Sequence, residues 1–69
     1  MKKEKNRMLY QAVQNLPEKQ RTVLFLRYAQ EMTLEEIAGL LHRPTGTVAS
    51  RLSKAKQTLK KQLEDYDHE

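Results

Sequence analysis

Hydrophobic residues recur at helical spacing along most of this 69-residue chain. The clearest case follows Thr33, where apolar residues occupy positions i, i+3, i+4 and i+7 and so share one face of a helix: Leu34, Ile37, Ala38 and Leu41. Thr33 and Glu36 have the spacing of a capping box, in which each side chain accepts a hydrogen bond from the backbone amide of the other residue. The pattern predicts a short amphipathic helix that begins directly after Thr33.

A second helix is predicted after the tight turn His42-Arg43-Pro44. The residue before a proline is disfavoured in the helical region, and the fixed φ of Pro44 suits the first turn of the next helix. That helix is expected to run to about Leu63, with one apolar side: Val48, Leu52, Ala55 and Leu59. Two helices joined by so short a turn form a helix-turn-helix, whose second helix commonly lies in the major groove of DNA.

Two further helices are predicted ahead of this pair. Residues 7–16 carry apolar residues on one side, namely Leu9, Val13 and Leu16, with Ala12 beside them. Pro17 then opens a helix to about Ala29, because proline suits the first helical position. This helix is dense in apolar residues, so we expect it to be the central and most buried element, with Phe25 and Tyr28 in the core.

The fold class predicted from these elements is all-α. We expect a small four-helix domain with a helix-turn-helix, of the winged-helix-like DNA-binding class but without a wing. The predicted boundaries are a flexible lead-in at residues 1–6, the domain at residues 7–63, and a frayed acidic tail at residues 64–69.

Charge is unevenly distributed along the chain, whose formal net charge is +4. Residues 43–61 carry six basic side chains and no acidic one, whereas residues 62–69 hold four acidic side chains. The basic block coincides with the predicted second helix of the helix-turn-helix, as an electrostatic footprint for phosphates requires. A solvated lysine-rich helix would show the same composition, and the adjacent turn favours DNA.

Other functions find little support in the residues. The chain has no cysteine, and its two histidines, His42 and His68, are not framed by carboxylate pairs, so no metal site or cofactor is expected. Glu35 and Glu36 are adjacent on a helix and point apart, and no nucleophilic triad or phosphate loop occurs, so we expect no enzymatic activity and no small-molecule substrate. No apolar run has the length of a membrane span, which favours the cytoplasm, in association with the nucleoid.

From Leu16 onward the sequence resembles region 4 of bacterial RNA polymerase sigma factors, and is most similar to the extracytoplasmic-function branch of the sigma-70 family. The resemblance lies in five motifs: Leu16-Pro17-Glu18-Lys19-Gln20-Arg21, Leu26-Arg27-Tyr28, Thr33-Leu34-Glu35-Glu36-Ile37-Ala38, Pro44-Thr45-Gly46-Thr47-Val48-Ala49-Ser50-Arg51-Leu52, and Lys54-Ala55-Lys56. A match in register over this length is far more specific than a bare helix-turn-helix pattern.

The resemblance implies both a ligand and partners. Region 4 reads the −35 promoter element of double-stranded DNA in the major groove and docks on the β flap of RNA polymerase, and in many members an anti-sigma factor covers it. The DNA contacts that it implies come from Thr45, Thr47, Ser50, Arg51, Ser53 and Lys54, with Thr33 and Arg43 near phosphates. A helical wheel independently places Thr47, Ser50, Ser53 and Lys54 on the outward face of the N-terminal half of the last helix.

The chain departs from the family pattern at several positions. Many relatives have a basic residue where Ala49 stands and an aromatic or basic residue where Ser53 stands. Lys54 and Lys56 replace arginines, and lysine lacks the bidentate fork that suits guanine. Nothing in the chain resembles region 2, which in the family melts the −10 element.

Three alternatives remain at this stage. The domain could bind polymerase or an anti-sigma factor without reading DNA, or it could be the output domain of a response regulator, although those tend to have Thr-Val-Lys-x-His where this chain has residues 47–51. Arg51 could contact a phosphate or pair with an internal carboxylate. Gly46 is interpreted as packing closely on the preceding helix, rather than as allowing a phosphate to approach.

Overall fold

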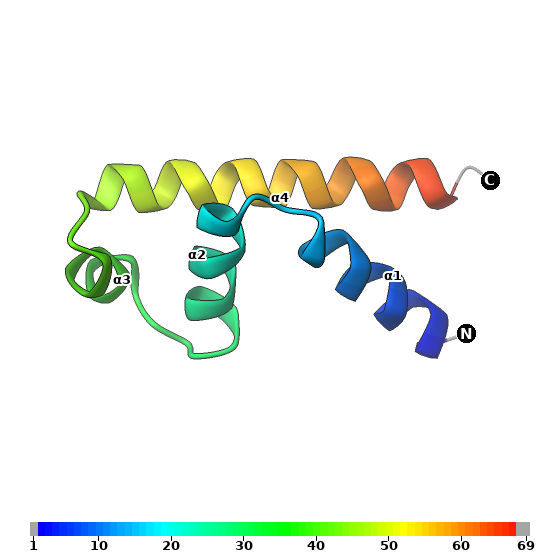
Figure 1. Ribbon diagram of the computed structural model, residues 1–69, viewed down its shortest axis with the longest axis horizontal. Coiled ribbons are helices and arrows are strands. Elements are labelled where there is room, and N and C mark those ends of the chain that lie inside the picture. Colours follow the sequence, from blue (N-terminus) through cyan, green and yellow to red (C-terminus); the bar gives the residue numbers. More distant parts are fainter. Residues whose placement is uncertain (1, 68–69) are drawn as a thin grey trace.

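The structure, a computed structural model, describes the backbone of residues 2–67 and the side chains of residues 7 and 9–64. It contains four helices: α1 (Lys2–Gln14), α2 (Glu18–Tyr28), α3 (Leu34–Leu41) and α4 (Thr45–Asp67). Helix α4 runs the length of the molecule, and the other three helices pack along one side of it (Figure 1). Over the described backbone the fold is all-α, as predicted, and none of its helices is both long and apolar enough to cross a membrane.

Two helix ends differ from the predicted ones. Helix α1 begins at Lys2 rather than near Arg7, and α4 continues to Asp67 rather than ending near Leu63. Neither extension contains a glycine or a proline, and lysine and glutamate propagate helices well. The rest of the predicted acidic tail, residues 68–69, lies outside the described residues.

The prolines stand one position ahead of their helices rather than in the first turn. Pro17 has φ −54° and ψ 146°, which is not helical, and its carbonyl accepts hydrogen bonds from the amides of Gln20 and Arg21 at 3.0 Å. The carbonyl of Pro44 likewise accepts from the amide of Thr47 at 3.0 Å. Each proline therefore ends the preceding turn and also supplies the first carbonyl of the following helix.

Helix α3 is fixed at both ends by local hydrogen bonds. The predicted capping box is confirmed: the Glu36 amide donates to Thr33 Oγ1 at 3.1 Å, and the Thr33 amide donates to Glu36 Oε1 at 2.8 Å. At the other end His42 adopts the left-handed conformation (φ 56°, ψ 46°), and the Arg43 amide donates to the carbonyl of Ala38 at 3.0 Å, which is a Schellman-type closure. An eight-residue helix is too short to be stable alone, so these caps and its packing hold it in place.

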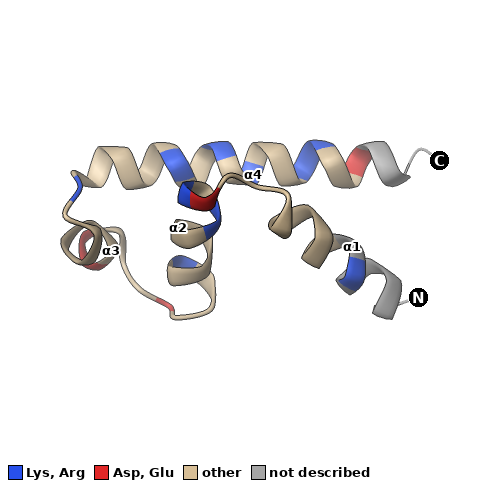
Figure 2. Cartoon of the chain, in the orientation of Figure 1, with Lys and Arg blue, Asp and Glu red and all other residues tan. Residues whose placement is uncertain are grey.

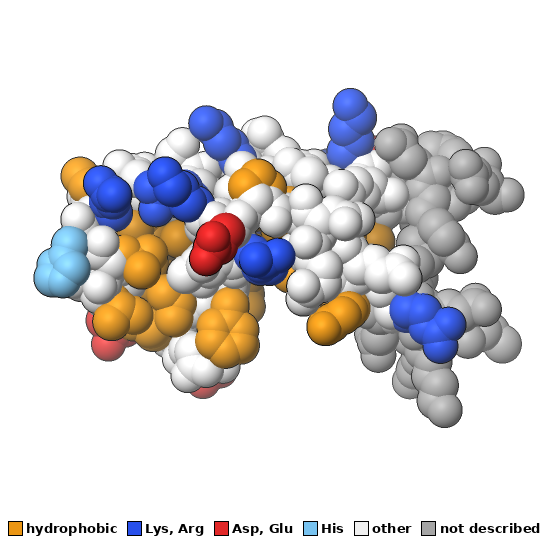
Figure 3. All heavy atoms as spheres, in the orientation of Figure 1, with side chains coloured by type: hydrophobic (Ala, Val, Ile, Leu, Met, Phe, Trp, Pro, Cys, Tyr) orange, Lys and Arg blue, Asp and Glu red, His pale blue; other side chains and the backbone are white. Residues whose placement is uncertain are grey.

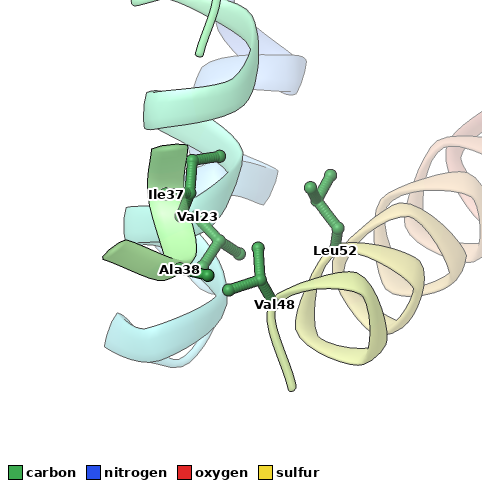
Figure 4. Close-up of a cluster of buried hydrophobic side chains, with 5 residues drawn as sticks. All are labelled: Val23, Ile37, Ala38, Val48 and Leu52. Carbon is green, nitrogen blue, oxygen red and sulfur yellow. The ribbon is translucent and has the colours of Figure 1, made fainter. Parts of the chain in front are cut away.

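The main core lies where α2, α3 and α4 meet (Figure 4). It is formed by five buried side chains, which Figure 4 labels: Val23, Ile37, Ala38, Val48 and Leu52. The predicted inward faces of α3 and of the N-terminal half of α4 are therefore confirmed. The remaining buried hydrophobic side chains are Ala12 and Leu16, towards α1, and Ala55 of α4.

The predicted centre of the domain was wrong. Val23 is the only fully buried side chain of α2, while Phe25 and Tyr28 are 55% and 54% exposed. The central element is instead α4, which contacts each of the other three helices. Since α3 and α4 cover only one side of α2, its other apolar side chains face the space towards α1.

Candidate nucleic-acid interface

The N-terminal half of α4 turns one side to the core and the opposite side to solvent. Val48 and Leu52 are buried, whereas Ser50, Ser53 and Lys54 are exposed. Thr47 is half-buried at the edge of the outward side. The surface that a major-groove reader needs is therefore free of the domain's own packing.

The other predicted contact residues lie around this surface. Thr33, Arg43 and Thr45 are exposed, and Arg51 is half-buried. Thr33 Oγ1 accepts the capping hydrogen bond from the Glu36 amide, but its hydroxyl proton stays available to a phosphate oxygen. The structure thus brings the turn residues and the first half of α4 together at one end of the molecule.

Basic side chains accompany α4 over most of its length. Figure 2 shows Lys and Arg at intervals along α4 and on the turn that leads into it, and acidic residues on α3 and beyond α2. The space-filling view shows the cationic side chains along the α4 edge, with apolar side chains exposed below them over α2 and α3 (Figure 3). The basic block of the sequence is therefore also a basic edge in space.

Gly46 does not pack closely against the preceding helix, contrary to the interpretation made from the sequence. A Cβ atom built at Gly46 meets no heavy atom within 4 Å. Its backbone φ is not in the left-handed region either, so neither packing nor strain within the domain requires glycine at this position. The other reading, close approach of a phosphate, stays a prediction.

The structure adds two cationic side chains, Arg27 of α2 and Lys56 of α4, that the site predicted from the sequence did not include. Both line a hollow of about 290 Å³ beside α4. Spacing could have placed Lys56 there, since it follows Ser53 by one helical turn. Arg27 comes from a distant part of the chain, and only the packing of α2 against α4 brings it to this hollow.

A second, larger hollow of about 800 Å³ lies between α1 and α2, which diverge from one another beside α4 (Figure 1). We call it the α1–α2 groove; its walls are mainly apolar and include Leu9, Tyr10, Val13, Leu24, Phe25 and Tyr28. At its rim Arg21 Nη1 donates to the carbonyl of Gln14 at 3.1 Å and links the two helices. Apolar side chains that remain this exposed in a small domain mark an interaction surface.

Metal ligation finds no geometry in the described part of the chain, where no three His, Cys, Asp or Glu side chains gather closely enough to hold an ion. The exposed polar groups of α4 and the basic edge are suited to binding an anionic polymer rather than to covalent chemistry.

Comparison with known proteins supports the resemblance seen in the sequence. Residues 6–59 match the family described as sigma-70, region 4. The chain is 42% identical over 57 residues to the ECF RNA polymerase sigma factor SigW of Bacillus subtilis, and 39% identical over 56 residues to the RNA polymerase sigma-H factor of Pseudomonas aeruginosa. It is 31% identical over 61 residues to the ECF RNA polymerase sigma-E factor of Haemophilus influenzae.

These alignments cover 83%, 81% and 88% of the chain, but only 30%, 29% and 32% of the three relatives. The chain therefore spans about a third of the length of the relatives that it matches. The motifs from Leu16 to Lys56, the four-helix fold and the match over residues 6–59 agree, and this chain belongs to the sigma-70 region 4 family.

Proposed function

We propose that this domain binds the −35 element of promoters in double-stranded DNA and thereby supports transcription initiation by a bacterial RNA polymerase. One observation carries the proposal: α4 buries Val48 and Leu52 while its opposite side exposes Ser50, Ser53 and Lys54 within a basic helix. The names of the relatives, which are RNA polymerase sigma factors, agree with it. In this role the domain acts by binding and catalyses no reaction, and its site of action is the nucleoid in the cytoplasm.

The dimensions of α4 suit the major groove. An α-helix with side chains is about 10–12 Å across, and the groove is about 12 Å wide. Ser50 and Ser53 are short, so the helix axis can approach the base edges closely, and each hydroxyl can both donate and accept. Lys54 supplies a single flexible cation without the bidentate fork of arginine, which predicts weaker discrimination of guanine than an arginine at this position gives.

Affinity for DNA should come mainly from phosphate contacts. Residues 43–61 carry six basic side chains and no acidic one, and the release of counterions from DNA makes such binding fall steeply with salt. Thr33, Arg43 and Thr45 lie around the start of α4, where the flanking phosphates of a bound groove would be.

The α1–α2 groove supports a second part of the proposal, that the domain docks on RNA polymerase through an apolar segment of the β flap. Phe25, Tyr28 and Leu9 remain about half exposed along it, at 55%, 54% and 43%, and their burial by a partner would remove apolar area from water. An anti-sigma factor that occupies this groove would compete with the polymerase.

A direct binding assay tests DNA reading. Fluorescence anisotropy should show that a duplex with a −35 element competes better than a scrambled duplex of equal length and charge. Lys54→Glu and Ser50→Glu should each abolish this preference, because they place a carboxylate against the DNA, while circular dichroism shows unchanged helicity. The matched control is Arg7→Glu, a charge reversal on α1 away from the start of α4, which should retain the preference.

The same variants separate the two classes of function. If wild-type protein binds all duplexes equally, or binds none even in complex with polymerase, DNA reading is refuted. Retention on polymerase that is lost in Phe25→Gln and unaffected by Lys54→Glu would then identify an interaction module that does not read DNA.

A further inference from the structure

A small hollow on the flank of α4, beside the outward face, combines an apolar floor with two cations. We call it the α2–α4 hollow; it is lined by Arg27, Leu34, Ala49, Leu52, Ser53 and Lys56 and has a volume of about 290 Å³. We propose that this hollow is a seat for one phosphodiester group of the DNA backbone, held by Arg27 and Lys56 with the Ser53 hydroxyl as a further donor. The inference rests on the proposed function and deepens it.

The hollow exists because two neighbouring side chains on this flank of α4 are small. Ala49 and Ser53 stand one turn apart, and both are exposed. They leave open the space beside Leu52 and Leu34, which form the floor. Ala49 and Ser53 are also the positions where the chain departs from the basic and aromatic side chains of many relatives. The departure thus removes bulk and charge from α4 itself but opens a site for an anion.

The chemistry of the lining favours an anion over any other ligand. Arg27 and Lys56 supply only donors, Ser53 can donate as well, and no carboxylate is among the lining residues. A tetrahedral phosphodiester has two free acceptor oxygens that two cations can share, and hydrogen bonds between ionised groups are the stronger kind. The nearby apolar floor excludes water and strengthens them further.

Arg27 is held in place by contacts within the domain. Its Nη1 donates to the carbonyl oxygen of Met32 at 3.1 Å, in the connection between α2 and α3. A guanidinium has five N–H donors, so this hydrogen bond orients the group and leaves other donors for a phosphate.

Lys56 is also positioned by a neighbour. Its Nζ lies 5.4 Å from the centre of the Tyr28 ring, within the range of a cation–π contact. Since both cations are restrained before the ligand arrives, binding a phosphate costs less side-chain entropy than it would with two free surface side chains.

The place of the hollow agrees with a helix that lies in the major groove. Ser53 belongs both to the outward face of α4 and to the hollow, so a DNA strand at the edge of the groove would pass from one to the other. Phosphate contacts of this kind carry no sequence information, but they fix the register and orientation of the reading helix. Arg27 and Lys56 would thus determine which side chains of α4 reach the bases.

The first test measures the salt dependence of DNA binding. Arg27→Gln and Lys56→Gln each remove one cation and approximately preserve side-chain length. If both cations contact the same phosphate, each variant should lower the slope of log K against log salt by up to about 0.9 and weaken binding by up to about eightfold at 0.1 M salt, for −35 and scrambled duplexes alike. Arg27→Lys keeps the charge and should keep most of the slope, and the control Arg7→Gln should leave both quantities unchanged.

The second test locates the phosphate. Duplexes in which one phosphate at a time is replaced by a neutral methylphosphonate should reveal a position where the replacement weakens binding of the wild-type domain. The same replacement should cost the Arg27→Gln/Lys56→Gln double variant little, because the interaction is already lost. Thermal unfolding of each variant, followed by circular dichroism, shows whether a loss of fold contributes.

The outcomes separate the two proposals. If the wild type prefers the −35 duplex while the variants keep its salt slope, and their losses add to those of every methylphosphonate, the phosphate seat is refuted and promoter reading stands. If the wild type binds no DNA, promoter reading itself fails. A salt slope that is reduced without any position-specific coupling would show a general charge effect and would likewise overturn the seat.

Discussion

Gly46 offers a test that separates what the domain needs to fold from what it needs to bind DNA. The residue lies in the first turn of α4, and a Cβ atom at this position meets no heavy atom within 4 Å. Gly46→Ala should therefore stabilise the free domain, since alanine loses less conformational freedom on folding than glycine. The same methyl group should obstruct DNA if a phosphate approaches the backbone here.

The expected gain follows from helix propensity. Replacing a helical glycine by alanine contributes about 0.5–1 kcal/mol when no atom has to move. In a domain of this size a change of 1 kcal/mol shifts the melting temperature by about 4–8 °C, so Gly46→Ala should melt at about 2–8 °C higher than wild type. Its affinity for the −35 duplex should fall roughly tenfold, which corresponds to about 1.4 kcal/mol.

The chain supplies its own control in Gly39 of α3, which is also helical and also has nothing within 4 Å of an added Cβ atom. Gly39→Ala should raise the melting temperature to a similar extent and leave DNA affinity unchanged. Thermal unfolding by circular dichroism and anisotropy titrations on the same preparations measure both quantities.

Two results would contradict the reasoning. A lower melting temperature for Gly46→Ala would mean that the space around the residue is needed within the domain. An increased melting temperature with unchanged DNA affinity in Gly46→Ala would remove Gly46 from the DNA interface.

Three further predictions concern stability. Thr33→Ala should cost about 1 kcal/mol, because it removes the hydrogen bond that Oγ1 accepts from the Glu36 amide, and Thr33→Ser should restore it; equal melting temperatures for wild type and Thr33→Ala would refute the role of the cap. His42→Gly should raise stability by up to about 1 kcal/mol, because glycine adopts φ 56° without strain; a decrease in urea denaturation would indicate a lost histidine contact. Phe25→Gln should change stability by less than about 1 kcal/mol, whereas Ile37→Ala, at a fully buried position, should cost about 2–5 kcal/mol; similar costs in chemical denaturation would contradict the observed core.

Helix α3 and the turn after it could be predicted from the sequence because local interactions determine them. The capping box depends on two residues three apart, and Pro44 restricts the residue before it. The left-handed conformation of His42 was less predictable, because the Schellman closure uses backbone groups, and no glycine marks the position.

The burial of α2 could not be predicted in the same way. Its run from Val23 to Leu26 is apolar on several sides, and composition alone does not tell which side meets other helices. The packing of α3 and α4 against one side of α2 leaves Phe25 and Tyr28 exposed. An apolar helix with an uncovered side predicts a partner as readily as a core, and only the coordinates distinguish the two.

The candidate site shows the same division. Periodicity was sufficient to place Ser50, Ser53 and Lys54 opposite Val48, because all lie on a single helix. The inclusion of Arg27 depends on the contact between α2 and α4, which no pattern in a single sequence reveals. Residues gathered from one element could be predicted, and those gathered from several could not.

The unbroken course of α4 has a mechanical consequence. This one rod carries the groove-facing end at its start and supports α1 further along, and it contains no glycine or proline after Gly46 at which it could bend. A rotation imposed on the rod by nucleic acid must therefore also swing the far end of the domain, and whatever is anchored there would sense how the helix is seated.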